Sequence, residues 1–146
     1  MFQVPRLESN LFKWLSRRDS DSLQGPYYLD SLDVTRCSRR VPEAAGIYFF
    51  VSKRFAFKYP QRKSKIYYIG RAKNLRKRLQ THKRYATQKR RLNRYWGRYE
   101  YARAFGCVVY WLQVSSRSVK RKEKECIKRF GKFFLAPPVT NSQSYW

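Results

Sequence analysis

Three short apolar runs in the chain have the composition of β-strands. Residues 46–52, 66–70 and 106–114 are rich in β-branched and aromatic residues, and turn-forming residues bound each run. The polar and basic segment 53–65 separates the first two runs. This arrangement predicts two strands joined by a hairpin loop, with a third strand later in the chain.

Helical patterns follow the second predicted strand. Asn74 is a good N-cap residue for a helix that ends near His82, with Leu75 and Leu79 as its apolar stripe. Residues 87–99 predict a second basic helix.

A further helix is predicted after the third strand. It would start at Ser116 or Ser118, where a hydroxyl can cap the first turn, and run to about Phe130. Gly131 and the Pro137-Pro138 pair are expected to end it.

The segment 1–40 has a weaker pattern. Apolar residues within 11–15 suggest a short helix, whereas Asp19 to Ser22 and Gly25-Pro26 read as loop. The apolar residues between Tyr27 and Val34 fit either a strand or a docked turn.

The predicted order of elements is β-β-α-α-β-α. It indicates a small α/β (α+β) domain over residues 41–146, in which helices flank a three-stranded, mainly antiparallel sheet. Residues 1–40 are predicted to be an N-terminal extension of uncertain structure.

Charge narrows the choice of partner. The chain carries a formal net charge of +25. Residues 1–45 hold seven Lys/Arg and six Asp/Glu, whereas residues 46–146 hold 27 and three. A field of this size favours a polyanion, most simply a nucleic acid. A non-catalytic basic protein of the ribosomal type would show the same charge.

The cysteines and the hydropathy indicate a compartment. Cys37, Cys107 and Cys126 are widely spaced and form no C-x-x-C motif, which argues against a disulfide framework or a zinc site. No stretch has the features of a signal peptide or a membrane span. We therefore expect reduced thiols, no membrane partner and a cytoplasmic protein of bacterial or phage-like type.

The best candidate carboxylate is Glu123. It shares a helical stripe with apolar residues at the spacing i, i+4, i+7, i+8 and i+11, namely Val119, Cys126, Ile127 and Phe130. An inward carboxylate needs a cation. Two interpretations stay open: a salt bridge to an arginine, or a ligand to one Mg²⁺ whose other positions are filled by phosphate and water.

Other candidates for phosphate chemistry lie on the predicted hairpin and the first basic helix. Arg78 can bind a phosphate through two parallel hydrogen bonds, although it is one arginine among many. His82 lies one turn later, where it is either incidental or a proton relay. Tyr48 and Tyr68 approach each other if their strands pair, and a tyrosine base would need nearby positive charge.

The motifs are similar to those of the GIY-YIG nuclease family. Gly46-Ile47-Tyr48 and Tyr68-Ile69-Gly70 resemble the two signature tripeptides, and the run from Tyr68 to Leu79 resembles the segment after them. The likeness is strongest to the N-terminal domain of the nuclease subunit of bacterial excision repair, and it covers about residues 41–141.

The resemblance implies roles for individual residues. The family's helical arginine falls ten residues after Tyr68, its metal-binding glutamate precedes an Ile by four residues, and a Pro-x-x-Asn follows. It implies Tyr48 as the base, Tyr68 as its assistant and Mg²⁺ (or Mn²⁺) as cofactor. The remaining implied site residues are Arg78, His82, Glu123 as the metal ligand and Asn141.

Two departures from the family pattern affect this assignment. Tyr48 and Tyr68 are 20 residues apart, so the hairpin is longer than usual. The stretch between Glu123 and Asn141 is extended by residues 131–136.

The leading hypothesis is a metal-dependent DNA endonuclease acting on duplex or branched DNA, in repair, restriction or a mobile element. The alternative is a catalytically inactive module on the same fold that binds DNA or RNA. The residues expected to contact nucleic acid are Arg71, Lys73, Arg76, Lys77, Lys83 and Arg84.

Overall fold

The computed structural model describes residues 10–29, 41–87 and 96–141. Cys37 and the whole of the predicted segment from Leu32 to Val34 lie outside these ranges. The helices and strands are α2 (Arg17–Ser22), β1 (Gln24–Tyr28), β2 (Gly46–Val51), β3 (Phe57–Lys58), β4 (Lys63–Ser64), β5 (Ile66–Ala72), α3 (Leu75–Thr87), α4 (Trp96–Phe105), β6 (Val108–Gln113) and α5 (Val119–Phe134).

The central sheet has four strands in the order β1-β6-β2-β5, and every neighbouring pair is antiparallel. The α+β class and the three predicted strands are confirmed. The fourth strand, β1, comes from the N-terminal segment and includes the Gly25-Pro26 pair that reads as loop. It joins the sheet because Tyr27 is buried against the Trp111 ring, with centroids 6.2 Å apart.

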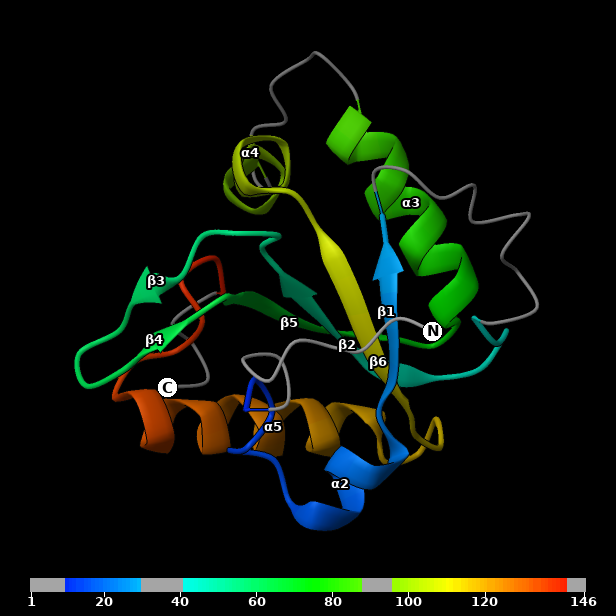
Figure 1. Cartoon of the computed structure of the whole chain (residues 1–146). Coiled ribbons are helices and arrows are strands. Elements are labelled where there is room, and N and C mark those ends of the chain that lie inside the picture. The colour runs from blue at the N-terminus through cyan, green and yellow to red at the C-terminus, as the bar shows by residue number, and fades with distance from the viewer. Residues whose placement is uncertain (1–9, 30–40, 88–95, 142–146) are drawn as a thin grey trace, which may run out of the picture.

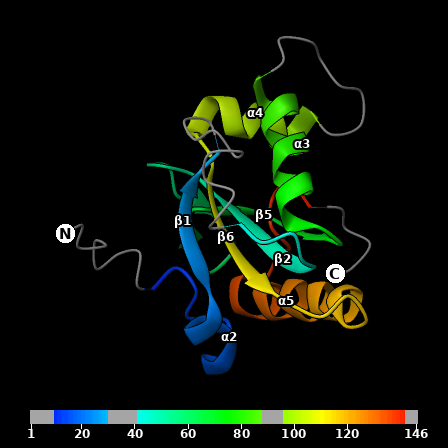
Figure 2. The same cartoon turned by 90° about the vertical axis from the view of Figure 1, so that its right-hand side faces the viewer.

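Helices cover both faces of the sheet. In Figure 1 α5 runs below it and α3 and α4 lie above it, and the turned view in Figure 2 agrees. Successive side chains of β2 point to opposite faces of the sheet, so they contribute to the core on both faces. Phe49 packs on Trp14, which in turn packs on Phe130 of α5. Phe50 packs on His82 of α3, with centroids 5.0 Å apart.

The predicted helix boundaries are partly wrong. Asn74 does cap α3, since its Oδ1 accepts a hydrogen bond from the Lys77 backbone N–H at 3.1 Å, but α3 continues past His82 to Thr87. The second basic helix, predicted over 87–99, is observed as α4 over 96–105; residues 88–95 lie outside the described ranges.

The final helix does not end at Gly131. α5 continues to Phe134 because Phe130 and Phe134 pack against each other at 4.3 Å and against Tyr59. It ends at Leu135, whose φ of 59° is left-handed.

The N-terminal segment also differs from the prediction. Residues 11–15 form turns rather than a helix, although their apolar side chains are buried. Asp19 to Ser22, predicted as loop, belong to α2, whose N-cap Ser16 accepts a hydrogen bond from the Asp19 backbone N–H. No helix in the described ranges is both long and apolar enough to traverse a bilayer.

The outer edge of β5 is covered by the segment that follows α5. The Thr140 backbone N–H donates to the Tyr67 carbonyl at 3.1 Å. The Asn141 side chain accepts from the Ile69 N–H at 2.8 Å and donates to the Ile69 carbonyl at 2.7 Å. An exposed sheet edge is thereby closed, and β5 is held in place on both sides.

Close packing explains why each signature tripeptide contains a glycine. Tyr48 is paired with Gly70 in the sheet register, and a Cβ at Gly70 would collide with the Tyr48 ring. A Cβ at Gly46 would lie 2.6 Å from the Leu75 side chain and would also meet the Leu112 carbonyl. Both tripeptides therefore contain glycine where the backbone approaches another group closely.

Replacing Gly70 by alanine is expected to destabilise the protein by about 1–3 kcal/mol, because the added methyl group overpacks the Tyr48 ring. Gly97→Ala is the matched control. A Cβ at Gly97 meets no atom within 4 Å, so this exposed helical site should lose no stability and gain up to about 1 kcal/mol. Urea unfolding of both variants measures the difference. Equal stability of the two variants would contradict the packing argument.

Candidate active site

Two tyrosines from neighbouring strands meet on the α3 side of the sheet. The ring centroids of Tyr48 and Tyr68 lie 5.9 Å apart. Tyr48 is fully buried, with 0% of its surface exposed, and the missing side chain of Gly70 leaves room for its ring. The sequence-based prediction that these two residues approach each other matches this geometry.

A hydrogen-bonded chain runs from Tyr48 into the core. The Tyr48 hydroxyl lies 2.6 Å from His82 Nε2, and His82 Nδ1 lies 2.9 Å from the Tyr99 hydroxyl. His82 is 1% exposed, so it is not on the surface of the helix. It continues the buried stripe of Leu75 and Leu79 at i, i+4 and i+7, a continuation that is visible in the sequence.

The ionisation of this chain is set by burial and by arginines. Burial, followed by Arg78 and Arg98, lowers the pKa of His82 well below its usual value. Burial and then Tyr68 raise the pKa of Tyr48 well above its usual value, although the two arginines oppose that rise. Near neutral pH, Tyr48 is therefore a phenol and His82 a neutral imidazole that can accept one hydrogen bond.

The buried neutral state of His82 makes the stability of the fold depend on pH. Its pKa is lower in the folded than in the unfolded chain, so its stabilisation is complete above about pH 6.5 and is lost as the pH falls. Between pH 6.5 and 5.5 the free energy of unfolding is expected to fall by up to about 1.4 kcal/mol per pH unit.

Because His82 is the only histidine of the chain, it is the one side chain expected to titrate from its ordinary pKa in this window. Urea unfolding at several pH values measures the slope, and the His82→Phe variant is the control. This variant loses two hydrogen bonds and should be less stable, but its stability should stay flat with pH. A wild-type curve as flat as that of the variant would contradict the buried neutral histidine.

Arg78 reaches this cluster from α3. Burial works to lower the pKa of its guanidinium, but Tyr48 and then Tyr68 and Tyr99 raise it on balance. The guanidinium is therefore hydrogen-bonded to the Tyr48 hydroxyl, and the side chain of Arg78 is exposed at a pocket that it lines.

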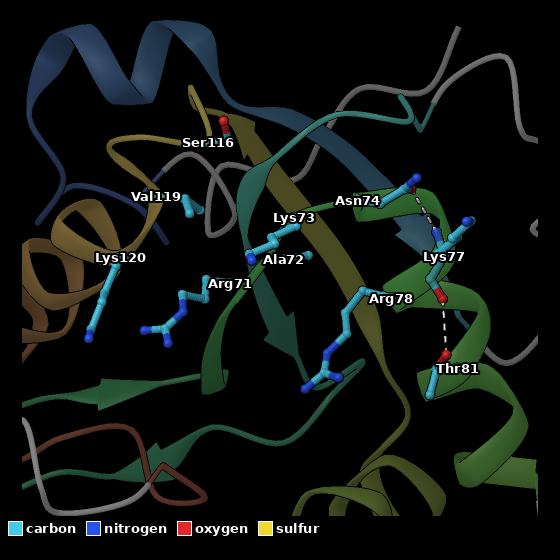
Figure 3. Close-up of a pocket in the computed structure, with 10 residues that line it drawn as sticks. All are labelled: Arg71, Ala72, Lys73, Asn74, Lys77, Arg78, Thr81, Ser116, Val119 and Lys120. Carbon is cyan, nitrogen blue, oxygen red and sulfur yellow. Dashed lines mark hydrogen bonds between the residues drawn. The ribbon is translucent and has the colours of Figure 1, made fainter.

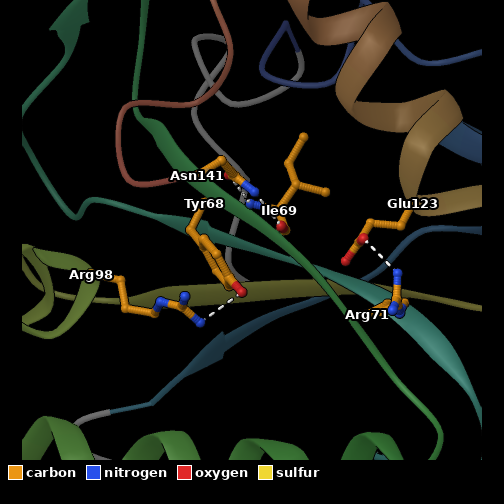
Figure 4. Close-up of polar contacts among 6 residues, drawn as sticks. All are labelled: Tyr68, Ile69, Arg71, Arg98, Glu123 and Asn141. Atoms are coloured by element: carbon orange, nitrogen blue, oxygen red, sulfur yellow. Dashed lines mark hydrogen bonds and ion pairs between the residues drawn. The ribbon is translucent and has the colours of Figure 1, made fainter. Parts of the chain in front are cut away.

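Glu123 approaches from the opposite layer. It is 8% exposed on α5, and its Oε1 lies 3.0 Å from Nη1 of Arg71 on β5 (Figure 4). Burial raises the pKa of Glu123, while Arg71 and then Arg78 and Arg98 lower it. The salt bridge that the sequence left open is thus present. Arg71 and Arg78 line one pocket, so residues from both sides of the sheet meet beside the edge strand β5.

Arg98 was not identified from the sequence, although it occupies the centre of this site. Its Nη1 donates a hydrogen bond to the Tyr68 hydroxyl at 2.7 Å, and its guanidinium carbon lies 4.1 Å from the Tyr68 ring centroid (Figure 4). The residue belongs to α4, in a basic segment where nothing distinguishes one arginine from another. Only the packing of α4 on α3 singles it out.

A basic pocket of about 490 Å³ adjoins these groups (Figure 3). Its walls come from α3, the end of β5 and the start of α5, and every charged residue lining it is a cation. The charged residues are Arg71, Lys73, Lys77, Arg78 and Lys120.

The other predicted nucleic-acid contacts are placed differently. Arg76 is turned toward its own chain, where it donates to the Val41 carbonyl at 3.0 Å and pairs with Glu43 at 3.5 Å. Arg84 is exposed and lies over the Tyr85 ring at 5.2 Å, and Lys83 is partly exposed on the same helix. These three residues do not line the basic pocket.

The side chains at this site could bind one metal ion, with most of its ligands supplied by phosphate and water. Within the described ranges, no group of three or more His, Cys, Asp or Glu side chains could hold a metal. Of the residues that the structure describes, Glu123 supplies the carboxylate at the site. Mg²⁺ commonly takes one or two carboxylates and completes its shell with phosphate and water, and this donor set is compatible with that pattern.

A model of the GIY-YIG catalytic domain matches residues 44–134. This range is more than half of the chain, and the protein belongs to the GIY-YIG family. Domains of this family are generally endonucleases that act on nucleic acids and use divalent metal ions. Searches of curated proteins and of solved structures found no match.

Proposed function

We propose that the protein is a metal-dependent endonuclease that hydrolyses phosphodiester bonds in DNA. The observation that carries the proposal is that Tyr48 and Tyr68 meet beside β5, while Arg78 and Arg71, the partner of Glu123, line one pocket at the same strand. Phosphodiester hydrolysis needs an activated water, stabilisation of the charged phosphate and help for the leaving oxygen. The site supplies a group for each of these needs.

Water activation falls to Tyr48 and His82. The Tyr48 oxygen takes a proton from the attacking water while its own proton moves to His82 Nε2 over 2.6 Å. His82 must then carry its first proton on Nδ1, where this N–H donates a hydrogen bond to the Tyr99 hydroxyl. This route keeps the buried Tyr48 neutral. The positive charge that it puts on His82 is transient, because burial and the two arginines disfavour the imidazolium as well.

Charge stabilisation falls to the arginines. As the water oxygen bonds to phosphorus, negative charge grows on the phosphate oxygens, and Arg78 at the wall of the basic pocket can take two of them. The Tyr68 hydroxyl, which accepts a hydrogen bond from Arg98, would donate to the same phosphate. Asn141 keeps β5 in place through both backbone groups of Ile69, so it supports the site without contacting the phosphate.

Glu123 is the residue that would hold the metal, and Arg71 controls its availability. A divalent ion bound there neutralises charge on the phosphate and on the leaving oxygen. The carboxylate is bonded to Arg71 at 3.0 Å. A DNA phosphate entering the basic pocket offers Arg71 another anion, so DNA binding releases Glu123 for the metal.

Supercoiled plasmid incubated with Mg²⁺ or with EDTA tests the proposal. We expect nicked or linear product only with Mg²⁺. Linear, branched and lesion-bearing duplexes of defined sequence then identify the preferred form of DNA. Cleavage that is equal with and without the metal, or absent on all substrates, would contradict the proposal. The repair role and the cytoplasmic location stay predictions.

The occupied carboxylate favours one alternative, a catalytically inactive module that binds DNA or RNA. In that case the Arg71–Glu123 ion pair would be purely structural. Such a protein would bind nucleic acid with an affinity that falls steeply with salt. Duplex DNA and RNA would compete for binding to it, and it would cut neither.

A further inference from the structure

Arg98 makes two contacts with one tyrosine. Its Nη1 donates to the Tyr68 hydroxyl at 2.7 Å, and the face of the same ring lies 4.1 Å from its guanidinium carbon. The two contacts fix both the oxygen and the plane of Tyr68. An arginine that merely reached for solvent-exposed phosphate would not cover a ring that is itself buried.

Helix stability does not explain this arginine. Arg98 is the third residue of α4, and the first turn of that helix holds no acidic residue. A cation at this end of a helix opposes the helix dipole. Its charge also acts on Tyr48 and His82 together with that of Arg78, and on Glu123 together with those of Arg71 and Arg78. The positive charges of three arginines therefore act on one carboxylate, a balance that suits a site for an anion.

The geometry points to Arg98 as a positioning residue for Tyr68, an inference that rests on the proposed function. The guanidinium occupies a lone pair of the Tyr68 oxygen, so the hydroxyl hydrogen is free to turn toward the phosphate. Tyr68 thus donates to the substrate, and Arg98 stabilises the negative charge that this donation leaves on the phenol oxygen. Arg98 acts through Tyr68 rather than by binding DNA itself.

A double-mutant cycle separates this role from a direct phosphate contact. The variants are Arg98→Ala, Tyr68→Phe and their combination, with Arg121→Ala as control for the loss of one exposed positive charge. Each is measured by single-turnover cleavage of a labelled duplex with Mg²⁺. We expect each single change at the site to slow cleavage by about 10–100-fold, and the double variant to be no slower than the slower single variant. Losses that multiply would overturn the inference.

The salt dependence of DNA binding, measured in EDTA, gives a readout that does not need cleavage. A residue that neutralises a phosphate contributes about 0.9 to the slope of log affinity against log salt. Arg98→Ala should leave the slope unchanged, whereas Lys77→Ala should reduce it by about one unit. A reduction of about one unit for Arg98→Ala would overturn the inference.

Thermal unfolding completes the design. Coupling between Arg98→Ala and Tyr68→Phe in the free energy of unfolding supports the contact, and additive effects overturn it. If the wild type binds DNA without cutting it in any metal, the proposed function fails. The salt slope and the unfolding cycle then still decide whether Arg98 acts on Tyr68.

Discussion

The Glu123→Gln variant is expected to cleave DNA at least about 1,000-fold more slowly than the wild type in single-turnover assays with Mg²⁺. Glutamine keeps the size of the side chain and one oxygen, but it removes the charge that would hold the metal at the phosphate. A metal contributes several kcal/mol of transition-state stabilisation, and about 4 kcal/mol corresponds to this factor. Quenched time courses on an end-labelled duplex provide the rates.

Glu125→Gln is the matched control for that variant. Glu125 lies two residues away on α5, is 47% exposed at its side chain and pairs with Lys122 at 3.5 Å. Its loss changes the net charge by the same amount on the opposite side of the helix, so cleavage should stay within about twofold of the wild type, as a weak surface ion pair predicts. A similar loss in both variants would mean that the charge of α5, and not the Glu123 carboxylate, governs activity.

The Arg78→Ala variant is expected to lose about 100- to 1,000-fold in the single-turnover rate, the usual effect of removing one donor to a developing oxyanion. Arg78→Lys keeps the charge but not the paired donors, so its rate should fall between those of the alanine variant and the wild type.

Arg121→Ala again controls for the loss of one exposed cation. Saturating DNA separates binding from chemistry: a defect that disappears at high DNA concentration would show that Arg78 only binds the substrate. Unfolding curves of the three arginine variants should overlap closely, since Arg78 is exposed. A large loss of stability in Arg78→Ala would invalidate the kinetic interpretation.

The sequence predicts three strands of the central sheet but not the fourth. β2, β5 and β6 are nearly continuous runs of apolar residues, so composition alone identifies them. β1 carries Gly25-Pro26, a turn signal, and it exists as a strand only because β6 offers an edge and Trp111 receives Tyr27. Pairing with a distant segment decides such a strand, and no local pattern contains that information.

The helix ends were predicted wrongly for a similar reason. Gly131 is a reasonable C-cap by propensity, but the packing of Phe130 on Phe134 and Tyr59 is worth more than the cost of one helical glycine. Tertiary contacts also lengthen α3 beyond His82 and place the second basic helix over 96–105. Burial of aromatic side chains, summed over the sheet, overrides these local signals.

The candidate site also combines features that can be predicted from the sequence with one that cannot. The inward direction of Glu123 follows from helical spacing, and the nearness of Tyr48 and Tyr68 follows from strand pairing. The burial of His82 was available from its spacing to Leu75 and Leu79. Arg98 was not, because its partner lies 30 residues earlier and only the docking of α4 brings them together.

The decisive experiment for metal-dependent cleavage at Glu123 is single-turnover cutting of one labelled DNA duplex in Mg²⁺ by wild type, Glu123→Gln and Glu125→Gln, purified in parallel. We expect metal-dependent cutting by the wild type and by Glu125→Gln, with Glu123→Gln inactive within the detection limit. Equal rates for all three proteins, or no cutting by the wild type while it binds the duplex, would contradict it.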